Sequence, residues 1–188
     1  MKKMIILLIV LLFSSQVIYS SDGENENIKN IKKMFAEINR KSNSSYLEYS
    51  RFQMVDNKNS TEGGMIVAFV LKKKFKKISV KYLGEMGKYD ADFYLKDNKI
   101  FFVYTIRTTY NAPMYLTKKQ AKKQGIDAFD PKKSTKEENR FYFKDSKLIK
   151  WLDDKKQEVD VKSKRSLEKS IELNKEIKRI ISLIKKEI

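Results

Sequence analysis

Apolar and polar residues alternate in two segments of the chain, 92–103 and 140–151, which align on each other without a gap. Each segment has an aromatic-rich run, a two-residue polar break (Asp97-Asn98 and Asp145-Ser146) and a second apolar run. Short polar residues of this kind adopt the backbone conformations that a tight turn requires. The pattern therefore predicts two similar β-hairpins.

The break at Asp97-Asn98 predicts the register of the first hairpin. Leu95 then lies opposite Ile100, and Phe93 lies opposite Phe102. Because side chains alternate along a strand, these four residues share one face, which is the predicted core. The opposite face collects the other large side chains of the two hairpins: Tyr94, Phe101, Tyr142, Ile149 and Trp151.

In the second hairpin the same register pairs Phe143 with Leu148. It also places Arg140 opposite Trp151, which predicts a cation–π contact. A looser third copy occupies 69–80, with a longer lysine-rich break. Three successive hairpins predict an antiparallel meander of about six strands, and the aromatic residues of 42–55 predict an additional, irregular strand.

One amphipathic helix is predicted at each end of this meander. Residues 24–41 place apolar residues at three- and four-residue spacing, and so do residues 163–187. The apolar residues of the second helix cover half of its circumference: Leu167, Ile171, Leu173, Ile177, Ile180, Ile181, Ile184 and Ile188. That breadth favours packing against a sheet over lying on a membrane surface. The predicted fold class is α+β, a meander flanked by an N-terminal and a C-terminal helix.

The segment 109–139 departs from regular alternation. Thr117 can cap a short helix that ends at Gly125, and four lysines fall within it: Lys118, Lys119, Lys122 and Lys123. A connection of this length inside a compact domain is either functional or disordered. The sequence predicts an exposed basic loop with a helical turn.

The N-terminus has the anatomy of a secretory signal peptide. Lys2 and Lys3 precede an uninterrupted apolar run over 4–13, and small or polar residues follow as far as Ser20. A membrane anchor would need about 20 apolar residues. Cleavage after Ser20 would leave a single domain over 21–188, without a transmembrane segment and located in the periplasm or secreted.

The chain is strongly basic, with 41 Lys and Arg against 24 Asp and Glu, a net charge of +17. Only six of the basic residues are arginines. Phosphate and nucleic-acid sites favour the arginine fork, so the lysine bias indicates a diffuse positive surface, and no nucleic-acid partner is expected. That surface either serves solubility or attracts an anionic surface such as lipid headgroups or envelope polymers.

The chain contains no His and no Cys. These absences exclude thiol nucleophiles, zinc sites built on thiolate or imidazole, and triads with a histidine base. The remaining candidates for acid–base chemistry are Glu85, Asp90 and Asp92. Asp90 and Asp92 would share a strand face and would balance Lys81 and Lys88. No catalytic residue, metal site or cofactor is predicted.

Three further stretches carry a resemblance: Gly84-Glu85-Met86-Gly87-Lys88-Tyr89 before the first hairpin, Tyr110-Asn111-Ala112-Pro113 after it, and Glu138-Asn139-Arg140-Phe141-Tyr142-Phe143. In this order, over about 64–153, the chain resembles a family of small exported bacterial proteins of uncharacterised function. The resemblance implies export and a sheet-based fold, and it brings no site residues.

The sequence thus predicts an exported, non-enzymatic protein that binds another protein or an anionic component of the cell envelope. Two alternatives stay open, an inhibitor or immunity-type protein for one extracytoplasmic enzyme and a carboxylate-dependent hydrolase. The candidate binding residues are the four lysines of the loop and the aromatic residues of the hairpin face opposite the core: Lys118, Lys119, Lys122, Lys123, Tyr94, Phe101, Tyr142 and Trp151.

Overall fold

A computed structural model of the chain describes residues 21–44, 50–55 and 60–187. The predicted signal peptide, 1–20, lies outside the described residues. The elements follow in this order: α1 (Ser21–Ser44), β1 (Ser50–Val55), β2 (Gly64–Leu71), β3 (Lys74–Gly84), β4 (Gly87–Lys96), β5 (Lys99–Thr109), α2 (Lys118–Gln124), the short 3-10 helix η2 (Pro131–Lys133), β6 (Thr135–Lys144), β7 (Lys147–Leu152) and α3 (Lys164–Glu187).

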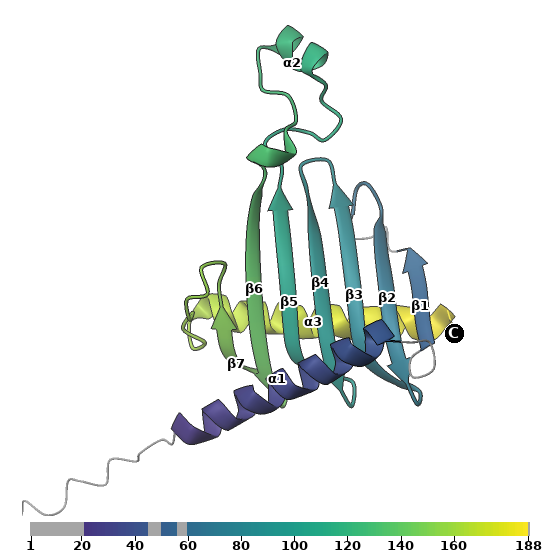
Figure 1. Cartoon of the computed structure of the whole chain (residues 1–188), viewed down its shortest axis with the longest axis vertical. Helices are drawn as coiled ribbons and strands as arrows, with labels where there is room; N and C mark the ends of the chain where they lie inside the picture. Colours follow the sequence, from purple (N-terminus) through teal and green to yellow (C-terminus); the bar gives the residue numbers. More distant parts are fainter. Residues whose placement is uncertain (1–20, 45–49, 56–59, 188) are drawn as a thin grey trace, which may run out of the picture.

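The seven strands form one antiparallel sheet in which each strand pairs with its neighbour in sequence. Helix α1 crosses one face of the sheet and α3 crosses the other (Figure 1). We refer to these as the α1 face and the α3 face. The predicted α+β meander with a helix at either end is confirmed, and the seventh strand, β1, falls within the predicted additional segment 42–55.

Three tight turns connect β2 to β3, β4 to β5 and β6 to β7. In each turn both central residues have positive φ: 49° and 62° at Lys72-Lys73, 50° and 61° at Asp97-Asn98, and 49° and 67° at Asp145-Ser146. Positive φ at both positions is typical of the type I′ turn, whose twist matches that of the strands. The lysine-rich break of the first hairpin is therefore two residues long, shorter than predicted.

A β-bulge interrupts each of the three hairpins, and it changes both of the registers that were predicted. Leu95 does pair with Ile100, but the next pair is Tyr94 with Phe102, and Phe93 pairs with Val103. The extra residue is Phe101, so Phe101 and Phe102 both contribute to the α1 face. The prediction that Phe93 and Phe102 share a face was wrong, because an inserted residue reverses the alternation beyond it.

The equivalent bulge between β6 and β7 moves Trp151 to the opposite face from the one predicted. Phe143 pairs with Leu148 as expected, but Trp151 pairs with Phe141 and belongs to the core under α3. Arg140 consequently does not meet Trp151. Its guanidinium lies over the ring of Tyr104, 5.1 Å from the centroid. The ring of Trp151 instead contacts the guanidinium of Arg165 from α3, which lies 4.8 Å from the ring centroid.

The sheet has one hydrophobic core on each of its two faces. The larger one, on the α3 face, packs α3 against strand residues that are almost fully buried: Ile66, Ala68, Ile78, Phe93, Leu95, Val103, Phe141 and Trp151. The smaller one packs Ile31 and Ile38 of α1 against Tyr94, Phe102 and Tyr142. Each large side chain removed from water in this way contributes about 1.5–3 kcal/mol.

The apolar stripe of α3 is narrower than predicted. Leu173 and Ile180 are fully buried, whereas Leu167 and Ile171 are 55% and 68% exposed. At 100° per residue, Leu167 and Ile171 lie about 120° and about 160° around the helix from Leu173. Only the stripe around Leu173 contacts the sheet, and Ile188 lies outside the described residues.

Candidate functional site

A long connection between β5 and β6, residues 110–134, projects beyond the end of the sheet (Figure 1). We call it the basic arm. It is shorter than the predicted loop 109–139, because β6 begins at Thr135. Its helix α2 is capped as predicted: Thr117 and Gln120 form a capping box, and Gly125 ends the helix with φ 69°. A capped helix on an ordered arm fixes the directions in which its side chains point.

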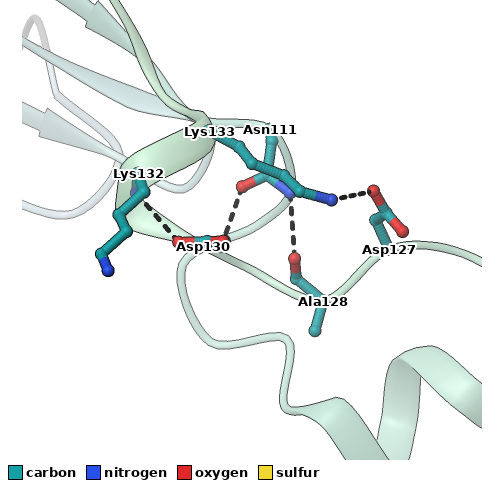
Figure 2. A network of polar contacts seen from close by, with 6 residues as sticks. All are labelled: Asn111, Asp127, Ala128, Asp130, Lys132 and Lys133. Atoms are coloured by element: carbon teal, nitrogen blue, oxygen red, sulfur yellow. Dashed lines mark hydrogen bonds and ion pairs between the residues drawn. The ribbon is translucent and has the colours of Figure 1, made fainter.

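Polar contacts at the base hold the arm in one conformation. The side-chain amide of Asn111 donates to the carbonyl of Ala128 (2.9 Å), and its oxygen accepts from the backbone N–H of Asp130 (2.9 Å), as Figure 2 shows. The Asp130 carboxylate accepts from the N–H of Lys132. The arm also has a small core of its own, formed by three buried residues: Ala112, Leu116 and Ala121.

The arm is basic, and its charge is accessible. It carries six lysines against Asp127 and Asp130. Asp127 forms an ion pair with Lys133 (2.8 Å), which lowers the pKa of the Asp127 carboxyl. The four lysines of α2 are all exposed, and none of them forms an ion pair with the rest of the described chain: Lys118, Lys119, Lys122 and Lys123. Ile126, just after α2, is 54% exposed.

The predicted aromatic candidates are not gathered on one surface. Tyr94, Phe101 and Tyr142 lie on the α1 face, where α1 covers them and leaves each 6% exposed or less. Tyr94 donates its hydroxyl to Asn39 of α1 (2.9 Å). Trp151, as described, is buried on the α3 face. These four binding candidates are core residues, and none of them is exposed to a partner.

The predicted carboxylates do not converge. Asp90 and Asp92 share the α1 face and border a hollow of about 360 Å³, but each is engaged by lysines. Asp90 lies 3.7 Å from Lys81 and 3.6 Å from Lys88, which confirms the predicted charge balance. Asp92 pairs with Lys77 (2.9 Å). Glu85 belongs to the turn between β3 and β4 and borders a different hollow.

A second site, on the α3 face, was not predicted from the sequence. Residues of the sheet and of α3 line a hollow of about 660 Å³, which we call the α3 groove. The sheet contributes Tyr82, Tyr89 and Arg107, which are cross-strand neighbours in one row over β3, β4 and β5. Helix α3 contributes the charged residues Glu172, Lys175, Glu176 and Arg179.

The sheet side of the groove is a stacked row. The rings of Tyr82 and Tyr89 are nearly parallel, with centroids 6.2 Å apart. The guanidinium of Arg107 lies 5.3 Å from the centroid of Tyr89. Arg179 donates a hydrogen bond to the Tyr82 hydroxyl (2.9 Å). The row therefore presents hydroxyl and guanidinium groups, rather than aromatic faces, toward the helix.

Tyr89 is the most unusual member of the row. Its hydroxyl is buried and has no hydrogen-bond partner in the described part of the chain. Burial raises the pKa of Tyr89 strongly, and Glu176 and Glu172 raise it further. The phenol therefore stays protonated at any physiological pH and remains a donor without an acceptor. Buried polar groups are normally paired, so such an orphan requires an explanation.

The groove continues in two directions. Toward β6 a hollow of about 260 Å³ adjoins it, where Trp151 donates its ring N–H to Asn139 (2.7 Å). Toward the turn between β3 and β4 lies a hollow of about 460 Å³, which shares Tyr82, Tyr89 and Arg107. A Cβ at Gly87 in this turn would lie 2.2 Å from the carbonyl oxygen of Thr108, so the close pairing of β4 and β5 here requires glycine.

Within the described residues, no three or more carboxylates come together in a group that could hold a metal ion. No helix there has both the length and the apolarity to cross a bilayer.

No protein-family model, curated protein or solved structure matches the chain. The resemblance drawn from the sequence therefore stays a prediction.

Proposed function

We propose that this chain is an exported, non-enzymatic binding protein whose basic arm attaches it to an anionic lipid surface of the cell envelope. One observation carries the proposal: four exposed lysines, without ion-pair partners among the described residues, stand on the capped helix of an arm that projects from the sheet. The sheet does not need this helix for its own core, since α1 and α3 supply the residues that cover its two faces.

The composition of the arm favours a lipid surface. Lysine ammonium groups act as point charges and suit a diffuse anionic field better than a single fixed phosphate. Ile126, Met114 and Tyr115 are each more than half exposed on the same arm. Apolar side chains among lysines are typical of segments that rest at a membrane interface. Each lysine near an anionic leaflet contributes about 1 kcal/mol.

The test is co-sedimentation of the processed protein with vesicles. Binding to mixed phosphatidylglycerol–phosphatidylcholine vesicles is expected, with little binding to phosphatidylcholine alone. The affinity should fall as the salt concentration rises, because salt screens the attraction between exposed charges. Replacing Lys118, Lys119, Lys122 and Lys123 with Gln should weaken binding by roughly 30-fold to 1000-fold if two to four of them touch the surface.

A matched control exists at the other end of the sheet. Four exposed lysines flank two of the hairpin turns: Lys96, Lys99, Lys144 and Lys147. Their replacement with Gln changes the net charge by the same amount. If this variant loses as much affinity as the arm variant, the attraction comes from the whole basic surface, and the arm has no special role. Arm-dependent binding to a soluble polyphosphate but not to vesicles would contradict the lipid assignment.

A further inference from the structure

We infer that the α3 groove binds a small organic oxyanion, a molecule that presents a carboxylate or phosphate group to Arg107 and Tyr89. The inference is independent of the basic arm, which lies at the end of the sheet. It rests on two hydrogen-bond donors in the groove that lack acceptors among the described residues, on the charges around them, and on the size of the hollow.

Arg107 is the first group. Among the described residues its guanidinium makes a stacking contact with Tyr89 (5.3 Å) and no ion pair. Two carboxylates in its neighbourhood have other partners. Glu137, its cross-strand neighbour on β6, accepts from the Asn139 amide (3.1 Å), and Glu172 of α3 pairs with Lys169 (2.8 Å). A stacked guanidinium keeps its edge free for two parallel hydrogen bonds to a carboxylate or phosphate.

The Tyr89 hydroxyl is the second group. It lies beside Arg107 in the same row, is buried, and has no partner among the described residues. Its raised pKa keeps it protonated, so it can donate but carries no negative charge that would repel an anion. A ligand oxygen that accepts from both Tyr89 and Arg107 would satisfy the orphan hydroxyl and the unpaired guanidinium together.

The charges lining the groove favour an anion. The lining carries three cations, Arg107, Lys175 and Arg179, and two carboxylates, Glu172 and Glu176, of which Glu172 is paired with Lys169. Cations are therefore in excess around the hollow. A positively charged ligand would meet this excess, and a neutral sugar would leave Arg107 without a counter-ion. The hollow of about 660 Å³ is within the range of small-molecule pockets and exceeds what a bare ion would fill.

The test combines thermal-shift and calorimetric titration of the purified protein with a panel of probes. Succinate and citrate represent carboxylates, and inorganic phosphate and glycerol phosphate represent phosphates. Glucose and choline serve as neutral and cationic probes, and sodium chloride matches the ionic strength. We expect at least one oxyanion to raise the melting temperature and the other probes to have no effect. The two oxyanion arms also show which group the site prefers.

Two variants locate the binding. Tyr89→Phe removes only a hydroxyl that has no partner, so the free protein should unfold at the same or a slightly higher temperature. Its affinity for the active oxyanion should nevertheless fall about tenfold to a hundredfold. Arg107→Gln should weaken binding at least about a hundredfold, since it removes the bidentate contact. This pairing of unchanged stability with lost binding separates a ligand role from a structural one.

Matched controls lie on the other side of the sheet. Tyr142→Phe removes a hydroxyl from the α1 face, and Arg40→Gln removes an exposed guanidinium from α1. Both should bind the oxyanion as the unmodified protein does. The inference is overturned if no oxyanion binds, if the controls lose as much affinity as the groove variants, or if glucose or choline binds in a manner that Tyr89→Phe and Arg107→Gln abolish.

Discussion

The two ends of the sheet are built differently, although the same strands run through both. At the hairpin end, three type I′ turns close the strands tightly, and the side chains behind them are buried. At the arm end, the strands lead into the basic arm and the turn beside Gly87. Strand β4 shows the change within a few residues. Phe93 is fully buried in the α3 core, whereas Tyr89, four residues earlier on the same face of the strand, borders the groove.

Stability and binding therefore reside at opposite ends of the sheet. The hairpin end buries large apolar side chains that are costly to remove. The arm end holds Tyr89, whose hydroxyl has no hydrogen-bond partner among the described residues, and it holds Arg107 and the lysines of α2, which form no ion pair with those residues. Functional groups commonly sit on loops and strand ends that a rigid scaffold holds in place. The two ends should therefore respond differently to comparable substitutions.

The largest effect is expected at the hairpin end. Phe93→Ala should lower the free energy of unfolding by about 3–5 kcal/mol, because the cavity adds to the lost transfer energy. Tyr89→Phe, on the same strand and face, should change it by less than about 0.5 kcal/mol. Urea denaturation followed by tryptophan fluorescence measures both, since Trp151 belongs to the same core. A small loss for Phe93→Ala would mean that the core under α3 is loosely packed.

Much of the hairpin end could be predicted from the sequence, because its signals are local. The polar breaks marked the turns, and the pairs next to each turn, Leu95 with Ile100 and Phe143 with Leu148, were correct. The bulges were not predictable, since no residue in the alternating pattern marks an insertion. One extra residue, Phe101, was enough to move Phe102 to the other face, and the equivalent bulge did the same to Trp151.

The groove escaped prediction for a different reason. Tyr82, Tyr89 and Arg107 come together only through the register of three strands, and Glu172 and Arg179 come from a helix about 70 residues later in the chain than Arg107. No spacing along the sequence connects them. The basic arm was easier, because Thr117, Gly125 and the lysines between them are a local helix signature. The sequence held one partial signal for the groove: Arg107 is one of only six arginines, and arginine is the residue that anion sites favour over lysine.

An intermediate effect is expected at the base of the arm. Asn111→Ala removes the hydrogen bonds to Ala128 and Asp130, each worth about 1 kcal/mol. Opening of the arm should then become easier by about 2 kcal/mol, roughly 30-fold, without unfolding of the sheet. Limited trypsin digestion should cleave at the arm lysines correspondingly faster, because cleavage follows the population of the open form.

The same variant also shows whether the arm unfolds independently of the sheet. Its urea midpoint should stay close to that of the unmodified protein, since the sheet and its two cores are untouched. A midpoint that falls together with the trypsin resistance would show that the arm unfolds with the sheet as one cooperative unit. The arm could then not be treated as a separate surface.

The smallest effect is a gain, at the first hairpin turn. Lys72 and Lys73 have φ of 49° and 62°, a region that side chains with a Cβ disfavour. Asn and Gly adopt these conformations more readily and are the preferred residues of a type I′ turn. The double substitution Lys72→Asn/Lys73→Gly should therefore raise the free energy of unfolding by about 0.5–1 kcal/mol in urea denaturation.

Charge offers a competing explanation of such a gain, because Lys74 and Lys76 follow the turn closely. Lys72→Gln/Lys73→Gln removes the same two charges but keeps a Cβ at both positions, so it should give little of the gain. Raising the salt concentration should also leave the advantage of the Asn-Gly turn unchanged, since backbone preference is not screened. If the Gln variant gains as much, or if salt removes the difference, repulsion between lysines limits the hairpin end, and its tight turns are not the source of its stability.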